Sequence, residues 1–246
     1  MTDNNHEEEL AEGTLLSHLI ELRSRLLIIA VAVLVAFIIL LPFSRDIFTL
    51  VSEPLREVLP GNAMIATAVA SPLLTPFKLT FFAALFLVMP VVLFQVWNFI
   101  APGLYKNEKR FAIPLLATSI ILFYLGIAFA YFVVFPLIFG FFTSIAPEGV
   151  EVQTDITQFL DFITTIVFAF GIAFEVPVAT VLIVWAGLTN IEKLAKARPY
   201  VFLMAFIAGM FLTPPDVISQ SLLAVPVYLL YELGIIMSKV FVSKKS

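Results

Sequence analysis

Six long apolar runs, separated by short polar segments, dominate the chain. They cover residues 22–41, 77–100, 111–135, 159–185, 200–212 and 217–237. Five of these runs have about 20 residues or more, the length with which an α-helix crosses the hydrocarbon core of a bilayer. The pattern predicts an all-α, polytopic membrane protein with six transmembrane helices. An even number of crossings places both termini on the same side of the membrane.

The fifth run is shorter than the others. Its thirteen residues reach only about 20 Å at 1.5 Å per residue, against a hydrocarbon core of about 30 Å. We therefore expect short fifth and sixth helices, with Asp216 and Gln220 drawn toward membrane depth. The alternative is that a strongly tilted neighbouring helix covers the deficit.

The first outer segment, residues 44–76, is too long to be a simple turn. Apolar residues recur in it at helical spacing, between charged ones: Ile47, Leu50, Val51, Leu55 and Val58. This pattern predicts an amphipathic helix on the outer surface, which Pro54 kinks or ends. A second outer segment is expected to begin at Pro136. Ordinary surface loops are the alternative interpretation of both segments.

The basic residues are distributed unevenly between the two sides of this topology. Eleven of the 14 lie on one side: Arg23, Arg25, Lys106, Lys109, Arg110, Lys193, Lys196, Arg198, Lys239, Lys244 and Lys245. Loops on the cytoplasmic side of membrane proteins carry such an excess of lysine and arginine. The distribution predicts that both termini are cytoplasmic.

Composition agrees with a membrane protein, since 61% of the residues are hydrophobic and the mean hydropathy is +1.05. The absence of cysteine excludes structural disulfides. The dispersed basic residues predict no nucleic-acid partner. The acidic, polar start does not resemble a cleavable signal peptide. We expect a flexible acidic tail over residues 1–13, a single transmembrane domain over 14–240 and a basic cytoplasmic tail over 241–246.

Glu175 is the charged residue that lies deepest within an apolar run. A charged side chain near the bilayer centre costs on the order of 3 kcal/mol and marks a functional site by default. Pro177 and Gly171 predict a kink beside it. Possible hydrogen-bond partners within the chain are Gln220, Ser119, Thr118 and Thr165. A structural glutamate is the alternative, but the sequence favours a partner from another chain or from substrate.

Two further carboxylates, Glu21 and Glu108, lie among basic residues at the predicted cytoplasmic interface. The residues alone favour local ion pairs, such as Glu21 with Arg25 four positions along a helix. The other interpretation is a two-carboxylate site for a cationic ligand that arrives from the cytoplasm.

Signatures of enzymes are missing from the sequence. The two histidines, His6 and His18, lie outside the apolar runs, and the chain has neither a phosphate-binding loop nor a His-Glu-x-x-His helix. We therefore expect no catalytic residues, no metal and no cofactor.

Several stretches together resemble one family, TatC, the multi-spanning subunit of the twin-arginine protein translocase. They are His18-Leu19-Ile20-Glu21-Leu22-Arg23, Ala70-Ser71-Pro72, the segment 94–104, Phe135-Pro136, Phe174-Glu175-Val176-Pro177, Arg198-Pro199-Tyr200 and Leu212-Thr213-Pro214-Pro215-Asp216. The resemblance runs from about residue 15 to residue 240.

This resemblance implies a receptor for signal peptides that carry paired arginines, with Glu21, Arg23, Phe99 and Glu108 at the peptide-binding positions. A guanidinium binds a carboxylate through two parallel hydrogen bonds, a geometry that lysine does not match. The resemblance thus reverses the preference for local ion pairs.

The resemblance also implies an intramembrane polar site and an assembly position. Glu175, Met210 and Gln220, together with Asp216, would contact the single-span partners TatA and TatB, and Pro54 would serve assembly of the complex. Further implied features are other copies of the chain, folded cargo, the proton-motive force and a bacterial inner membrane. A proton-coupled small-molecule carrier, with Glu175 as its proton site, is the alternative function.

Overall fold

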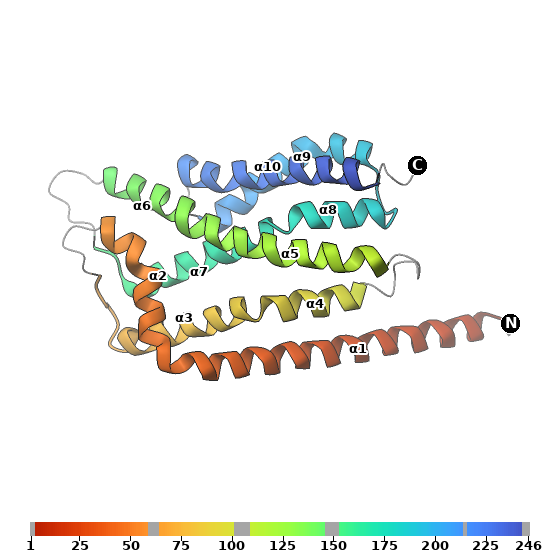
Figure 1. Cartoon of the computed structure of the whole chain (residues 1–246), viewed down its shortest axis with the longest axis horizontal. Helices are drawn as coiled ribbons and strands as arrows, with labels where there is room; N and C mark the ends of the chain where they lie inside the picture. The colour runs from red at the N-terminus through yellow and green to blue at the C-terminus, as the bar shows by residue number, and fades with distance from the viewer. Residues whose placement is uncertain (1–2, 59–63, 101–108, 146–152, 214–215, 243–246) are drawn as a thin grey trace.

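A computed structural model of the chain describes residues 3–58, 64–100, 109–145, 153–213 and 216–242, and these are almost entirely helical. The α-helices are α1 (Asp3–Leu40), α2 (Ser44–Val58), α3 (Ser71–Leu87), α4 (Met89–Ile100), α5 (Lys109–Phe129), α6 (Phe135–Ser144), α7 (Ile156–Ala173), α8 (Val176–Trp185), α9 (Ile191–Leu212) and α10 (Val217–Val242). Figure 1 shows both termini at one end of the bundle, called here the terminal end, and α2 at the opposite end, called the α2 end.

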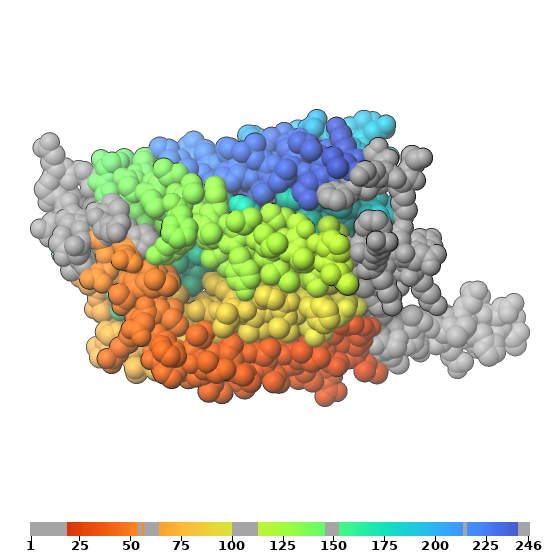
Figure 2. Space-filling model, viewed as in Figure 1, coloured from red at the N-terminus to blue at the C-terminus, as the bar shows by residue number. Residues whose placement is uncertain are grey.

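The expected number of crossings is confirmed. Within the described ranges, five helical segments are long and apolar enough to cross a membrane, and the bent pair α3–α4 gives a sixth. The side chains that α1 exposes are largely apolar: Leu26, Leu27, Ile28, Val31, Leu34, Val35, Ile38 and Ile39. Figure 2 shows α1 along one edge of the bundle, where lipid tails can solvate these side chains.

Two of the spans are interrupted where a proline enters the next helix. The second span bends by 49° between α3 and α4, with Pro90 as the second residue of α4. The fourth span breaks at Phe174 and Glu175, with Pro177 in the first turn of α8. Proline lacks the N–H of an interior helical residue, so the helix must bend or restart there. The predicted kink beside Glu175 is confirmed.

Pro136, where a second outer segment was expected to begin, lies in a helix, so the alternative of an ordinary surface loop is wrong there. The chain continues from α5 through a π-helical segment, Ala130–Val134, into α6, which ends at Ser144. Pro136 occupies the first turn of α6, where a proline is tolerated. Before it, the Phe135 N–H donates to the Ala130 carbonyl five residues earlier, which is the wider turn of a π-helix.

The predicted short fifth and sixth helices are also wrong in length. Helix α9 has 22 residues because the basic segment 193–198, expected to be a loop, forms its first turns, and α10 has 26 residues. Asn190 caps α9, with its side-chain oxygen accepting from the Lys193 N–H at 2.8 Å. At the other terminus, α1 begins at Asp3, so the segment expected to be a tail is helical, and its flexibility stays a prediction.

The amphipathic helix predicted for the first outer segment is confirmed as α2. Its backbone continues through Pro54 to Val58, so the helix does not end at the proline, whose side chain lies outside the described part. Figure 1 shows α2 turned steeply away from α1 across the end of the bundle. The Tyr131 hydroxyl donates to the Leu50 carbonyl at 2.7 Å and ties α2 to the third span.

The main core lies where the third span packs on α7. Its buried members are Ala130, Val134, Phe135, Ile138, Phe139, Phe159, Ile163, Ile166, Val167, Phe170 and Leu223. Gly126 of α5 allows the two helices to approach closely, because a Cβ there would lie 2.6 Å from the Phe170 carbonyl oxygen. Gly126 therefore marks a close contact between α5 and α7.

A polar bridge closes the α2 end of the bundle. Residues Ile65 and Asp155 pair in an isolated parallel β-bridge, with Ile65 N–H donating to the Thr154 carbonyl at 3.1 Å. One Asp155 oxygen caps α7 by accepting from the Thr157 N–H at 2.8 Å, and the other accepts from the Thr67 hydroxyl at 2.7 Å. Hydrogen bonds from Thr67, the hydroxyl first and then the N–H, hold the pKa of the Asp155 carboxyl well below its usual range, against the opposing effect of burial.

We expect Gly126→Ala to destabilise the fold by about 1–3 kcal/mol, because the new methyl group meets backbone of α7 that cannot move aside without strain. Thermal denaturation of the purified protein in detergent measures the change. Gly140→Ala is the matched control, since nothing lies within 4 Å of a Cβ there. Equal denaturation temperatures for the two variants would contradict the close packing of α5 on α7.

We expect Asp155→Asn to lower the denaturation temperature at neutral pH. The carboxyl has a lower pKa folded than unfolded, so it stabilises the fold above the unfolded value of about 4, and this contribution is lost as the pH falls further. The variant should therefore lose less stability than the parent between about pH 5 and about pH 3. The exposed Asp46→Asn is the control, and parallel pH curves for parent and Asp155→Asn would refute the bridge.

Candidate functional site

A polar cluster joins α1 and α4 at the terminal end of the bundle. Arg25 Nε donates to Glu21 Oε1 at 3.1 Å, and its Nη2 contacts the same oxygen. The guanidinium also reaches α4, where Nη1 donates to Gln95 Oε1 at 3.2 Å and Nη2 to the Asn98 carbonyl at 3.0 Å. Since α4 ends at Ile100, the cluster lies close to the terminal end of the bundle. The predicted local ion pair of Glu21 with Arg25 is confirmed.

Of the other predicted peptide-binding residues, only Phe99 is found beside this cluster in the described part of the chain. Phe99 follows Asn98 on α4 and is half-buried, so it lies beside the cluster. Arg23 is exposed on α1. Glu108 lies outside the described residues. The sequence pointed to Glu21 and Phe99 but not to Gln95 and Asn98, although both stand in the motif segment 94–104.

Glu175 has one hydrogen-bond partner from its own bundle. The Ser119 hydroxyl of α5, 1% exposed, donates to Glu175 Oε2. The other carboxyl oxygen, Oε1, is buried and has no hydrogen-bond partner among the described residues. Ser119 was one of the four possible partners, and the half-satisfied carboxyl leaves room for a donor from another chain.

A second polar spot lies at the α2 end, where α9 turns into α10. Asp216 Oδ1 accepts from the Ser219 N–H at 2.7 Å at the start of α10, while Asp216 Oδ2 and the Ser219 hydroxyl are buried without a partner in the described part of the chain. Gln220 packs against Gly209, since a Cβ built on Gly209 would lie 3.5 Å from the Cα of Gln220. Met210 is exposed on α9.

The structure separates Glu175 from this second spot. A Cβ on Gly234 of α10 would lie 3.0 Å from the Cα of Pro177, which is two residues after Glu175. Glu175 therefore lies beside the part of α10 near Gly234. Gln220 is fourteen residues earlier, or about 21 Å along the helix axis. The four residues predicted to form one intramembrane site therefore lie at two distinct depths.

Two ion pairs that the sequence analysis missed connect neighbouring spans. Arg198 of α9 donates to both carboxyl oxygens of Glu232 on α10, at 2.6 and 2.9 Å. Lys78 of α3 pairs with Asp161 of α7 near the α2 end. The available signal was the presence of Lys78, Asp161 and Glu232 within apolar runs, because charges there require partners.

These features define a class of protein: a multi-pass helical membrane protein with one carboxylate, Glu21, at the terminal end of the bundle. A second carboxylate, Glu175, lies inside the bundle and has a hydrogen-bond partner for only one of its oxygens among the described residues. Within the described ranges, no group of three or more His, Cys, Asp or Glu side chains is placed to hold a metal ion.

Comparison with known proteins identifies the family. The family model for the Sec-independent protein translocase protein, TatC, matches residues 17–226, and the chain belongs to this family. The TatC protein of Azotobacter chroococcum is 62% identical over 90% of this chain and 87% of that protein. The TatC protein of Escherichia coli K12 is 58% identical over 94% of this chain and 90% of its own length.

Solved structures agree with the family assignment. A crystal structure of the twin-arginine translocase receptor TatC superposes with a TM-score of 0.81 at 37% identity, over 91% of this chain and 98% of that one. A second crystal structure of that receptor, in the detergent DDM, gives a TM-score of 0.82 at 36% identity, over 90% and 99%. The predicted all-α polytopic fold and the family are confirmed, and the protein is a translocase component rather than a member of a catalytic family.

We expect Ser119→Ala to destabilise the protein by about 1–3 kcal/mol, because it leaves both oxygens of a buried carboxyl without a partner. In a Glu175→Leu background the same change should be close to neutral, since no carboxyl remains to be satisfied. Thermal denaturation of the four proteins gives the coupling energy. Thr118→Val is the matched control, as its hydroxyl bonds only the Pro114 carbonyl of its own helix. A coupling energy near zero would contradict the pairing of Ser119 with Glu175.

Proposed function

We propose that this protein is the receptor core of a twin-arginine translocase, and that Glu21, Phe99 and Glu108 receive the paired arginines of a signal peptide. The single observation that carries the proposal is the binding of Arg25 by Glu21, together with Gln95 and Asn98, at the terminal end of the bundle. This cluster already recognises a guanidinium group, the chemical group that the signal peptide supplies.

The geometry of the cluster favours arginine over lysine. A guanidinium has five N–H donors in a fixed plane, whereas the lysine ammonium is a point charge without that planar geometry. Arg25 uses this fork to span from a carboxylate on α1 to an amide and a carbonyl on α4. An incoming arginine would replace Arg25 on Glu21, and Glu108 would receive the second arginine.

Single-span partner proteins, TatA-like and TatB-like, are proposed to use the two polar spots within the bundle. Glu175 Oε1 and Asp216 Oδ2 are buried acceptors that have no partner in the described chain, and a polar side chain of a partner helix would supply the missing donors. The exposed side chain of Met210 adds an apolar contact on α9. Pro54 on α2 is proposed to contribute to assembly with other copies of the chain.

We place the terminal end of the bundle in the cytoplasm and the α2 end outside a bacterial inner membrane. The excess of lysine and arginine at the terminal end supports this orientation. Transport of folded cargo would then draw on the proton-motive force. The family gives no support to the alternative, a proton-coupled small-molecule carrier.

A photocrosslinking experiment tests the proposed peptide site. Membrane vesicles containing the full chain are illuminated with a signal peptide that carries Arg-Arg or Lys-Lys beside the photoreactive group. We expect Glu21→Gln and Glu108→Gln each to reduce crosslinking of the Arg-Arg peptide about tenfold or more, because each removes a charge-assisted hydrogen bond. The Lys-Lys peptide should crosslink weakly to every variant.

Glu53→Gln, an exposed glutamate of α2 at the opposite end, is the matched control and should leave crosslinking unchanged. Equal crosslinking of the two peptides, or full crosslinking after both substitutions at positions 21 and 108, would overturn the assignment.

A further inference from the structure

A charged pair at the α2 end stands above an apolar groove, and neither feature has a role in the receptor site. Lys78 on α3 and Asp161 on α7 pair with each other but remain 47% and 52% exposed. Lys78 is seven residues from the start of α3 and Asp161 five from the start of α7, or about 10 and 8 Å along the helices.

This depth matches the polar surface layer of a membrane. The headgroup regions make a bilayer of about 40–45 Å from a hydrocarbon core of about 30 Å, which leaves about 5–8 Å for each surface. With the first residues of α3 and α7 at the membrane surface, Lys78 and Asp161 would lie near the boundary between the headgroups and the acyl chains. One ammonium donor and one carboxyl oxygen are used in their mutual contact, so both groups retain capacity for a ligand.

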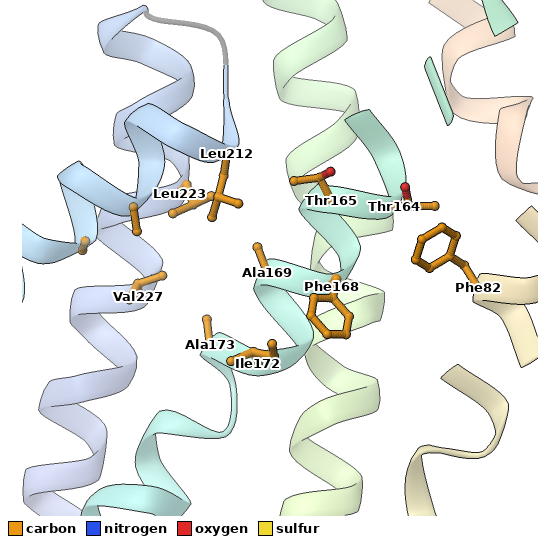
Figure 3. A pocket seen from close by; sticks show the side chains of 12 residues that line it. Phe82, Thr164, Thr165, Phe168, Ala169, Ile172, Ala173, Leu212, Leu223 and Val227 are labelled. Carbon is orange, nitrogen blue, oxygen red and sulfur yellow. The ribbon is translucent and has the colours of Figure 1, made fainter. Parts of the chain in front are cut away.

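The groove begins one helical turn below the pair. Phe82 follows Lys78 by four residues and Thr165 follows Asp161 by four, so each lies on the same helix face as its charged residue. Figure 3 shows Phe82 pointing from α3 toward α7, where Thr164 is the labelled side chain that faces it. The groove has a volume of about 440 Å³ and continues between α7 and the pair α9–α10 to Ala173.

The lining of the groove suits a hydrocarbon chain. Thr164 and Thr165 supply its hydroxyl groups, which already donate to the Leu160 carbonyl at 2.8 Å and the Asp161 carbonyl at 2.7 Å. The remaining walls are apolar, and alanines at positions 169, 173, 205 and 208 keep the groove open. From Thr165 to Ala173 it extends about 12 Å along α7.

We propose that this groove binds a diacyl phospholipid with a zwitterionic, primary-amine headgroup, which is the chemistry of phosphatidylethanolamine. The Lys78 ammonium donates to the lipid phosphate, the lipid ammonium donates to the Asp161 carboxylate, and one acyl chain descends past Phe82 and Phe168 toward Ala173. Charge complementarity selects this lipid. A quaternary ammonium has no N–H for Asp161, and a headgroup with net negative charge is repelled by it.

The lipid site is separate from the proposed partner face of α9. Ala205, Ala208 and Leu212 recur at helical spacing on the side that lines the groove. Met210 is two residues from both Ala208 and Leu212, or about 200° around the helix, and so points away from the groove. A lipid in the groove would fill the space between α3, α7 and α9 without covering Met210.

Native mass spectrometry of the full chain in detergent tests the proposal. The probes are palmitoyl-oleoyl phosphatidylethanolamine, the matching phosphatidylcholine and phosphatidylglycerol, and glycerophosphoethanolamine, which has the headgroup without acyl chains. We expect phosphatidylethanolamine to bind about tenfold more tightly than either other lipid, the effect of one charge-assisted hydrogen bond, and the headgroup alone not to bind.

The variants separate the two halves of the site. Asp161→Asn should abolish the preference for ethanolamine over choline, Lys78→Gln should weaken all three lipids, and Ala169→Phe should block the groove while leaving the charged pair intact. Arg198→Gln, which breaks the other ion pair, is the control and should keep the preference. Unchanged denaturation temperatures without lipid show that the variants fold.

Two results would overturn the proposal: equal binding of ethanolamine and choline lipids by the parent chain, or a preference that survives Asp161→Asn. Photocrosslinking of a single-span partner helix at Thr165, in competition with the lipid, would instead assign the groove to protein. These variants do not change the proposed peptide site at Glu21. A negative result for lipid binding would therefore not contradict the proposed receptor function.

Discussion

Hydrocarbon offers no hydrogen bonds, and this constraint governs where the chain can depart from a regular helix. An unsatisfied backbone group in lipid costs several kcal/mol, so irregular backbone is tolerated only where protein shields it. The π-helical turn at Ala130–Val134 lies in the main core, and the break at Phe174 lies against α5 and its Gly126. These two interruptions are thus buried in the contact between the third span and the fourth.

Because of the same constraint, buried side-chain oxygens without a hydrogen-bond partner indicate where the chain could contact another molecule. Most buried side-chain oxygens in the described chain find a partner, often the carbonyl one turn earlier, as Thr164 does with Leu160. Glu175 Oε1 and Asp216 Oδ2 do not. With the Ser219 hydroxyl, these are the buried side-chain atoms that lack a partner among the described residues. Asp216 precedes Gly234, which packs against Pro177, by eighteen residues, or about 27 Å along the helix axis, so two separate contacts with other chains would suit the two carboxyls better than one.

Features set by local chemistry were predictable from the sequence, and features set by tertiary contact were not. The apolar runs predicted the crossings, Pro177 predicted the break in the fourth span, and the spacing of Ile47 and Leu50 predicted α2. The error at α9 arose because Lys193 and Arg198 were taken as loop residues, whereas basic residues continue a helix readily once Arg198 can pair with Glu232 on α10. No spacing along the chain reveals that partner, 34 residues away.

The occupied state of Glu21 bears on how a receptor of this kind discriminates between peptides. In the proposed exchange, an incoming guanidinium replaces Arg25, whose Nε and Nη2 both contact Glu21 Oε1. Contacts to this carboxylate are then lost as others are gained, and the net affinity from Glu21 alone would be small. Arg25 would still keep its hydrogen bonds to Gln95 and to the Asn98 carbonyl, which reduces the penalty of its release. A lysine ammonium gains less at Glu21 while displacing the same fork. Under the proposed function, competition with an internal arginine would turn a modest difference in geometry into rejection of lysine, and the second proposed carboxylate, Glu108, would make binding favourable.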